Sequence, residues 1–366
     1  MAETTTPEKA AERLFSAETI DKAWFSGQGL ASAVPRVVDD MKRELGAFQY
    51  ISPCGDRCAA VFERGEIHFD MQIDGEGLIT SILLDLPVVY AESLEAAIEA
   101  FSELPGSSAV YVSRNGEMIG ELNGHEPMAV GSAFKLAVLK ALNQLIGAGK
   151  LEWDQVVELK EKWHSVPSGQ LQDWPVGAPL TVHTLASLMI SVSDNTATDA
   201  LIDLVTRNSV ETISPRNRPF MTTREFFQLK RLDMADNRRA YVDGSYDERS
   251  AILERFDEVG PPRVSELEAD PLLQIEWFFS AQELCGLMND LHTLDVLQIN
   301  PGLARKEDWR SVSYKGGRDF GVFNLTTGLT THEGDRYCVS ATWNDTQSLD
   351  QWTIFTKYLA LLHQLK

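Results

Sequence analysis

The sequence predicts two domains that mix helix and strand: a small α+β domain over residues 1–88 and a larger α/β domain over residues 89–366. Three observations lead to this prediction. Near the N-terminus, two helical patterns precede a strand of period two. A second hairpin pattern begins only after residue 100, and the last strand patterns return near the C-terminus. A chain of 366 residues is long enough for each domain to bury its own core.

Two helical patterns, residues 9–25 and 33–45, open the smaller domain. The stretch EIHFDMQID then alternates apolar and polar residues, and its apolar face consists of Ile67, Phe69, Met71 and Ile73. This period marks a half-buried strand, and the Asp-Gly pair that follows is a hairpin turn signal. LITSILLDL supplies the next strand. We therefore expect helices packed on a curved antiparallel sheet.

A helix over residues 93–104 and a hairpin that turns at Asn115-Gly116 open the larger domain. Mostly helical sequence runs from residue 132 to residue 288. Three strands, SVSYKGG, GVFNLTTGLT and YCVSATW, and an amphipathic helix over 349–365 complete the chain. A sheet built from both ends of a domain, with helices inserted between, predicts two lobes with a cleft between them. The charged segment 237–271 predicts a surface excursion or a lid.

Composition limits the partners of this chain. Its 33 Lys and Arg residues stand against 54 Asp and Glu residues, and the net charge of −21 argues against a nucleic-acid partner. No stretch reaches the roughly 18 apolar residues of a membrane span. The first residues show no export signal, so the chain as it stands fits the cytoplasm, or the periplasm or extracellular space if a signal peptide has been removed. We expect a small-molecule substrate.

The cysteines and histidines indicate no metal site. Cys285 and Cys338 lie in apolar stretches, which predicts that they are small core residues. Cys54 and Cys58, in SPCGDRC, could close a tight disulfide loop in an oxidising compartment. The seven histidines lack metal-type spacing, and no phosphate-binding glycine loop is present. We expect neither a metal nor a cofactor.

The stretch GSAFKLAVLKAL places a lysine within an apolar helical run, three residues after a serine. Residues at i and i+3 share a helix face, so the amine of Lys135 can approach the hydroxyl of Ser132. A buried lysine with a lowered pKa can take the proton of a serine nucleophile. A helix cap followed by a snorkelling lysine would produce the same pattern.

Two further triplets strengthen the catalytic interpretation. Ser193-Asp194-Asn195 lies between two helical runs, and Lys315-Gly316-Gly317 ends a strand pattern. An S-D-N triplet is expected by chance roughly 0.05–0.1 times in a chain of this length. The order helix start, inter-helix loop and strand makes chance a poor explanation for the three motifs together.

With these motifs the sequence resembles the penicillin-recognising serine hydrolases, which carry S-x-x-K, S-D-N and K-[ST]-G. The resemblance covers roughly residues 93–366, and within this range the chain looks most like a two-domain branch whose second domain is similar to class A β-lactamases. GSAFK, PSGQLQ, MISVSDNTATD, PFMTTREFF and YKGG are similar to a two-domain branch that includes a clavulanate-biosynthesis accessory hydrolase and mycobacterial lipoproteins. The resemblance implies a β-lactamase/transpeptidase-like domain after an isomerase-like N-terminal domain of the steroid-isomerase/NTF2 type.

The resemblance also implies roles for the motif residues. Ser132 would be the acylated nucleophile and Lys135 its base. Ser193 would relay a proton to the leaving group, and Asn195 would hydrogen-bond the substrate. Lys315 would lower the pKa of Lys135.

The third motif and one loop complete the implied site. The backbone N–H groups of Ser132 and Arg318, next to Gly317, would form the oxyanion hole, where one donor contributes about 3 kcal/mol to lowering the barrier. Trp174, just after PSGQLQ, would line the rim of the cleft.

The sequence departs from the family pattern at two places. Gly316 stands where the family has a hydroxyl residue, and Arg318 could compensate. No stretch aligns with the omega loop, whose glutamate activates the deacylating water. Glu225 in MTTREFF is the nearest carboxylate, although it also fits a helix start. Losing a general base costs about 10²–10⁴-fold in rate, so we expect poor turnover of penicillins.

These observations favour a cofactor-free serine hydrolase that forms an acyl-enzyme on Ser132 with a small ester, lactam or amide. One alternative is a peptidoglycan carboxypeptidase or transpeptidase. A second alternative is a non-catalytic protein that binds an acyl-amide ligand, which the missing glutamate would fit.

Overall fold

The computed structural model describes residues 5–53, 57–256 and 259–366. Contacts between residues divide it into two compact units, each with helices and strands, as the predicted mixed fold class requires. One unit runs to Ala100 and includes Asp350–Lys366, and the other is Phe101–Leu349. The domain boundary between residues 88 and 89 stays a prediction beside this division. The possible Cys54–Cys58 disulfide falls on residue 54, which lies outside the described residues.

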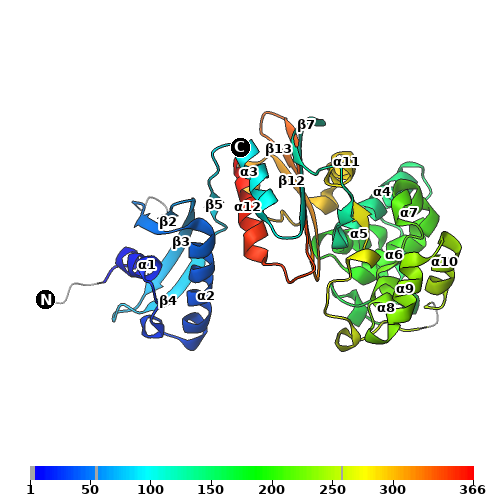
Figure 1. The fold of residues 1–366 in the computed structure, drawn as a ribbon, viewed down its shortest axis with the longest axis horizontal. Helices are drawn as coiled ribbons and strands as arrows, with labels where there is room; N and C mark the ends of the chain where they lie inside the picture. The colour runs from blue at the N-terminus through cyan, green and yellow to red at the C-terminus, as the bar shows by residue number, and fades with distance from the viewer. Residues whose placement is uncertain (1–4, 54–56, 257–258) are drawn as a thin grey trace. The chain divides into compact units, whose positions relative to one another are not determined.

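In the first unit, helices pack on an antiparallel sheet (Figure 1). The sheet order is β1-β2-β3-β4, and β5 pairs with β3. These strands are β1 (Phe48–Ile51), β2 (Cys58–Phe62), β3 (Gly65–Ile73), β4 (Ile79–Leu84) and β5 (Val88–Val89). The predicted alternation in β3 is confirmed, because Ile67 and Phe69 are buried while Asp70 and Gln72 between the apolar positions are exposed.

The two N-terminal helices differ in extent from the sequence patterns. α1 (Pro7–Ser16) ends well before residue 25, and a separate short turn, η1 (Lys22–Trp24), follows because Asp21 caps it through the N–H of Ala23. α2 (Gln28–Leu45) begins before residue 33 and continues through Pro35. The unit is completed by α3 (Leu94–Glu99) and by α12 (Gln351–His363), which contacts α2, α3 and β5.

The second unit is built on an antiparallel sheet whose order is β12-β13-β14-β6-β7. Its strands are β6 (Ser107–Arg114), β7 (Glu117–Leu122), β12 (Ser311–Asp319), β13 (Val322–Thr330) and β14 (Arg336–Asn344). Because β14 pairs with β6, strands from the two ends of this unit are neighbours, as the sequence predicts. Short two-stranded ladders join β8 (Met128–Ala129) to β11 (Phe278–Phe279) and β9 (Val156–Glu158) to β10 (Pro179–Thr181).

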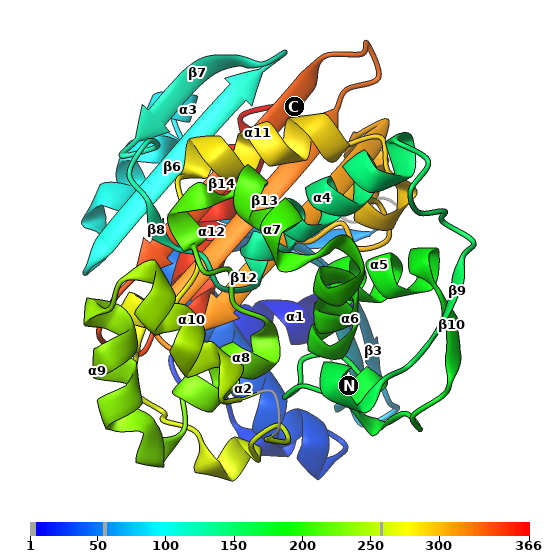
Figure 2. The same cartoon turned by 90° about the vertical axis from the view of Figure 1, so that its right-hand side faces the viewer.

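The helices of the second unit lie between β8 and β12 in sequence. They are α4 (Lys135–Gly147), α5 (Val182–Ser191), α6 (Asn195–Val205), α7 (Arg207–Ile213), α8 (Thr223–Leu229), α9 (Ala235–Asp243), α10 (Tyr246–Glu254) and α11 (Ala281–Leu291). The first two turns of α4 are almost entirely buried, and α4 contacts α6, α7 and α11. Figure 2 shows α11 lying across β6, β14 and β13. The predicted excursion 237–271 includes most of α9 and all of α10.

The expectation that Cys285 and Cys338 are core residues is confirmed, but the sequence analysis did not predict that they pair. Both side chains are buried, but they form a disulfide that joins α11 to β14. The packing of α11 on the sheet brings the two Cα atoms to 5.6 Å, a separation that a disulfide spans. The outer helix and a central strand of the sheet are therefore linked covalently.

Candidate active site

Ser132 lies in a single 3₁₀ turn, η3 (Gly131–Phe134), which leads directly into α4. The backbone of Gly131 has a φ of 50°, a left-handed conformation that favours glycine. A Cβ atom on Gly131 would also lie 2.9 Å from the backbone nitrogen of Arg318. Glycine thus permits both the turn and its close approach to β12, and it leaves Ser132 half-buried in a cavity.

Lys135 is the first residue of α4 and is fully buried. Its ammonium donates to the carbonyl of Ser193 at 2.5 Å, to Ser193 Oγ at 3.0 Å and to Asn195 Oδ1 at 2.7 Å. Burial and, next, the charge of Lys315 lower the pKa of Lys135 well below its ordinary value. The three contacts join the first predicted motif to the second, and none of them is with Ser132 Oγ.

The Ser193-Asp194-Asn195 motif forms the turn between α5 and α6. Ser193 has a φ of 58°, which costs a non-glycine residue about 1–2 kcal/mol. Its carbonyl accepts from Ser168 Oγ at 2.7 Å in addition to Lys135. Asp194 caps α6 through Ala197 N–H and also accepts from Gln170 N–H at 2.7 Å. The PSGQLQ loop is therefore tied to this motif by hydrogen bonds.

Lys315, from the middle of β12, reaches the same serine. Its ammonium donates to Ser193 Oγ at 3.1 Å and to the carbonyl of Gly316 at 2.5 Å. Lys315 is 3% exposed, and burial lowers its pKa to about 7. Two lysines thus converge on one hydroxyl group, a geometry in which each ammonium disfavours the charge of the other.

Glycine is required at each of the two glycine positions of the third motif for a different steric reason. A Cβ on Gly317 would lie 2.7 Å from Ala133 N and 2.8 Å from Ser132 N, so only glycine lets β12 pack on η3. A Cβ on Gly316 would overlap the hydroxyl of Tyr314. The Tyr314 hydroxyl therefore occupies the space that a side chain at position 316 would need. The motifs did not indicate this role of Tyr314.

A cavity of about 260 Å³ contains Ser132. Asn195 and Arg318, which the sequence places in the site, line it as well. Aromatic side chains supply much of the remaining wall, namely Phe134, Phe226, Phe227 and Trp277. Trp174 is 40% exposed just after η5 (Leu171–Asp173) and is not among the lining residues, so its place at the rim stays a prediction.

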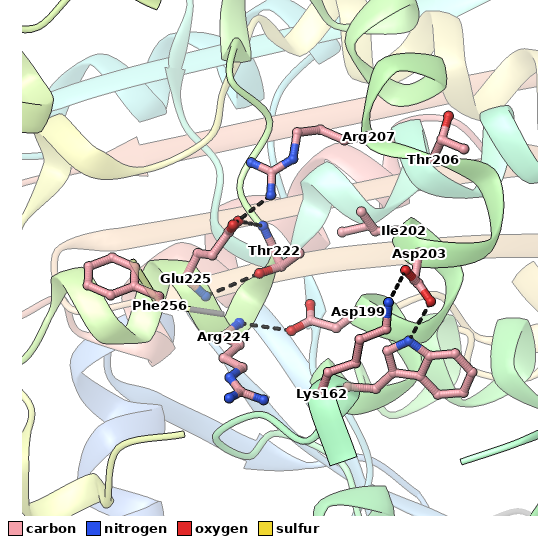
Figure 3. Close-up of a pocket in the computed structure, with 11 residues that line it drawn as sticks. Lys162, Asp199, Ile202, Asp203, Thr206, Arg207, Thr222, Arg224, Glu225 and Phe256 are labelled. Carbon is pink, nitrogen blue, oxygen red and sulfur yellow. Dashed lines mark hydrogen bonds and ion pairs between the residues drawn. The ribbon is translucent and has the colours of Figure 1, made fainter. Parts of the chain in front are cut away.

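Glu225, the sequence candidate for the water-activating base, lies in the wall of a different cavity of about 490 Å³ (Figure 3). Its carboxylate accepts from Arg207 at 2.5 Å and from Thr222 N–H at 2.7 Å, which completes a capping box at α8. Ser132 is not among the residues that line this cavity. The helix-start interpretation of Glu225 is therefore the one that fits its contacts.

The same second cavity contains Asp199, which is 3% exposed. Burial raises the pKa of Asp199 to about 7, although the N–H groups of Thr223 and Arg224 donate to its carboxylate. Thr223 in turn donates to the carbonyl of Asn195 at 3.2 Å. Asp199 thus holds Thr223, which lines the Ser132 cavity, in place by hydrogen bonds.

The motif analysis missed three charged residues of the Ser132 site. Glu276 and Asp319 line the cavity, and Lys230 forms an ion pair with Asp319. Asp319 follows Arg318 directly, so its place near the site was open to prediction from the third motif. Lys230 lies before the excursion 237–271 and Glu276 lies after it, and no motif marks either residue.

Among the residues that the structure describes, no three His, Cys, Asp or Glu side chains are grouped so as to hold a metal ion. Within the same ranges, no helix has the length and apolar character needed to cross a membrane.

Residues 90–242 match the model of the Beta-lactamase enzyme family. Among solved structures, a β-lactamase from Sphaerobacter thermophilus has a TM-score of 0.53 at 17% identity, with 75% of this chain and 94% of that chain covered. The chain has a β-lactamase-like fold. A class A β-lactamase from Bacteroides cellulosilyticus has a TM-score of 0.51 at 16% identity, with 75% and 100% covered.

PBP-A is a further solved structure with a similar fold. A PBP-A variant, solved as an acyl-enzyme complex with penicillin G, has a TM-score of 0.50 at 13% identity, with 74% of this chain and 93% of that chain covered. No curated protein matches the chain.

Proposed function

We propose that this protein is a serine hydrolase of the β-lactamase-like superfamily, which forms an acyl-enzyme on Ser132 with a small ester, lactam or amide. One observation carries the proposal: Ser193 Oγ lies 3.0 Å from Lys135 Nζ and 3.1 Å from Lys315 Nζ. The two buried amines meet at the Ser193 hydroxyl. The cavity beside them contains the Ser132 hydroxyl, which is the proposed nucleophile.

In the proposed reaction, the neutral amine of Lys135 takes the proton of Ser132 Oγ, which attacks the substrate carbonyl carbon. The resulting oxyanion accepts hydrogen bonds from the backbone N–H groups of Ser132 and Arg318. The bond to the leaving group then breaks, and the proton that Lys135 took from Ser132 passes through Ser193 to that group, which leaves Lys135 neutral. Acyl-Ser132 and a protonated leaving group result.

The match to the family model supports the proposal, because residues 90–242 include Ser132, Lys135, Ser193 and Asn195. Lys315 lies beyond this range. Its hydrogen bond to Ser193 supports including the third motif in the proposed site. We further propose poor turnover of penicillins, since Glu225, the glutamate nearest to the family pattern, is bonded elsewhere.

For the N-terminal part we propose kinship with isomerase-like domains of the NTF2 type, as in the two-domain hydrolase branch. Two helices on a five-stranded antiparallel sheet are consistent with that architecture. This part of the proposal concerns ancestry and assigns no activity to the domain.

Intact mass spectrometry of the wild type and of Ser132→Ala tests the proposal. After exposure to p-nitrophenyl esters and to penicillin G, the wild type should gain one acyl mass and the variant none. An unmodified wild type without esterase activity would instead favour a binding protein. Release of D-alanine from a peptide that ends in D-Ala-D-Ala would favour the carboxypeptidase alternative.

A further inference from the structure

A cluster of two carboxyl groups and one ammonium, in which Glu276 and Lys230 are buried and Asp319 is half-buried, takes no part in the acylation proposed above. Glu276 is 5% exposed and lines the same cavity as Ser132, as does Asp319. Lys230 is 1% exposed, and its Nζ donates to Asp319 Oδ2 at 2.5 Å. Burying ionisable groups such as Glu276 and Lys230 is costly unless each has a partner, so their placement at or beside the Ser132 cavity calls for a chemical explanation.

The backbone holds these carboxyl groups next to the nucleophile turn. Trp277 follows Glu276, and its carbonyl accepts from the N–H of Val130 at 3.0 Å. Val130 lies two positions before Ser132. Asp319 follows Arg318, whose backbone packs on Gly131. Both carboxyl groups are therefore carried by segments that are themselves anchored to η3.

Glu276 and Asp319 are placed to share a proton. Neither carboxyl oxygen of Glu276 accepts a well-formed hydrogen bond from the described residues, while the carboxyl of Asp319 lies within hydrogen-bonding reach. Two adjacent carboxylates resist being charged together, and a single proton between them supplies the missing hydrogen bond. Burial and, next, the charge of Asp319 raise the pKa of Glu276 well above its ordinary value, against the opposing ammonium of Lys230.

We infer that Glu276, paired with Asp319 and Lys230, is the base that activates water to release the acyl group from Ser132. This inference rests on the proposed acylation of Ser132 and concerns small acyl groups such as acetyl; the proposal of poor turnover concerns penicillins. The cavity of about 260 Å³ has room for water beside an acyl group, since a water molecule takes roughly 30 Å³.

The inferred step balances as follows. The oxygen of water bonds to the acyl carbon while its proton moves to the Glu276 carboxylate, where Asp319 shares it. The oxyanion is held by the N–H groups that served acylation. The bond from carbon to Ser132 Oγ then breaks, Ser132 Oγ takes up the proton that Glu276 removed from water, and a free carboxylic acid leaves. Glu276 is then a carboxylate again, and Lys135 is neutral as it was before acylation.

Deacylation by this route depends on pH in a defined direction. The charged groups that act on Glu276 are Asp319 and its partner Lys230, and the exposed Arg318 lines the same cavity. Because the pKa of Glu276 is raised, the proton-accepting form is scarce near the ordinary pKa of a glutamate and increases as the pH rises. A raised pKa also makes the carboxylate a stronger base once it forms. Deacylation should therefore accelerate with increasing pH.

Stopped-flow measurements with p-nitrophenyl acetate on the full chain separate the two steps. The burst of p-nitrophenolate reports acylation, and the steady rate together with the loss of the acetyl adduct in mass spectra reports deacylation. Glu276→Gln should keep the burst rate of the wild type and release the acetyl group about 10²-fold or more slowly. Glu211→Gln is the matched control, because Glu211 is equally buried, at 4% exposure, and does not line the Ser132 cavity; it should change neither step.

The Asp319→Asn variant provides a second test, a shift in the pH profile of deacylation. A purely structural role of Glu276 would not produce this shift. Removing the neighbouring charge lowers the pKa of Glu276, so the rising limb of the deacylation profile should move to lower pH. The inference is overturned if Glu276→Gln deacylates at the wild-type rate, if the limb stays in place in Asp319→Asn, or if the wild-type adduct never decays. Absence of any adduct on wild-type Ser132 would overturn the proposed function itself, which is a distinguishable result.

Discussion

Lys135 Nζ and Ser193 Oγ lie 3.0 Å apart although 58 positions separate them in the sequence. This contact closes the Ser132 site from the side of the helices, as Lys315 closes it from the side of the sheet. Neither lysine has a carboxylate as a hydrogen-bond partner in these contacts, so both ammonium groups depend on neutral oxygens. Their protonation should control acylation.

Lys315→Met should shift the pH dependence of acylation upward. The charge of Lys315 lowers the pKa of Lys135, and its removal leaves a more basic amine, whose neutral form appears only at higher pH. The rising limb of the burst rate against pH should therefore move to higher pH. An unchanged limb would show that Lys315 does not influence the base. A shift to lower pH would show that the base is a group other than Lys135.

Gly317→Ala should abolish acylation and destabilise the second unit. The new methyl group would meet the backbone nitrogens of Ala133 and Ser132, and the main chain on both sides would have to move apart. We expect the burst rate to fall by about 10²-fold or more, since displacing one oxyanion donor costs about that much. Gly286→Ala is the control, because a Cβ there meets no atom within 4 Å, and a helical alanine gains about 0.5–1 kcal/mol.

Gly316→Thr should be destabilising by itself and tolerated better with Tyr314→Ala. A threonine side chain needs the space that the Tyr314 hydroxyl occupies, and overpacking of this kind costs about 1–3 kcal/mol. Urea unfolding of the two single variants and the double variant should give a non-additive cycle, with the double variant more stable than the sum of the two. Additive effects would contradict the proposed steric conflict.

Replacing both Cys285 and Cys338 with alanine should lower the free energy of unfolding by about 4 kcal/mol. The disulfide closes a loop of 53 residues, and the chain-entropy estimate for that length is of this size. Denaturant titration of oxidised wild type, reduced wild type and the double variant measures the change. A difference below about 1 kcal/mol between the oxidised wild type and the double variant would contradict the assignment.

The parts of the site that carry local signatures were open to sequence prediction, whereas pairings between distant segments were not. Ser132, Lys135, Ser193 and Lys315 could be proposed because motif spacing and element type restrict their roles. The structure brings Lys135, Ser193 and Lys315 together and places Ser132 in the adjoining cavity. Burial of Cys285 and Cys338 followed from their apolar neighbours, but their bond depends on where α11 crosses β14, which local patterns do not specify.

Glu276 shows the second limit of sequence reasoning. It lies between η9 (Leu273–Ile275) and β11, and nothing in the flanking letters distinguishes it from a surface glutamate. Its burial results from the pairing of β11 with β8, which is a long-range contact. The ends of α1 and α2 were missed for a local reason, since an Asp21 cap and a tolerated Pro35 outweighed the apolar period.

The disulfide between Cys285 and Cys338 also has a topological meaning. The covalent ring that it closes contains all of β12 and β13, and therefore Lys315, Gly317 and Asp319. A single proteolytic cut between residues 285 and 338 would leave β12 attached to the rest of the molecule, and the fragments would separate only after reduction. In the oxidised protein, β12, the edge strand beside Ser132, would thus stay attached after a single cut in this segment.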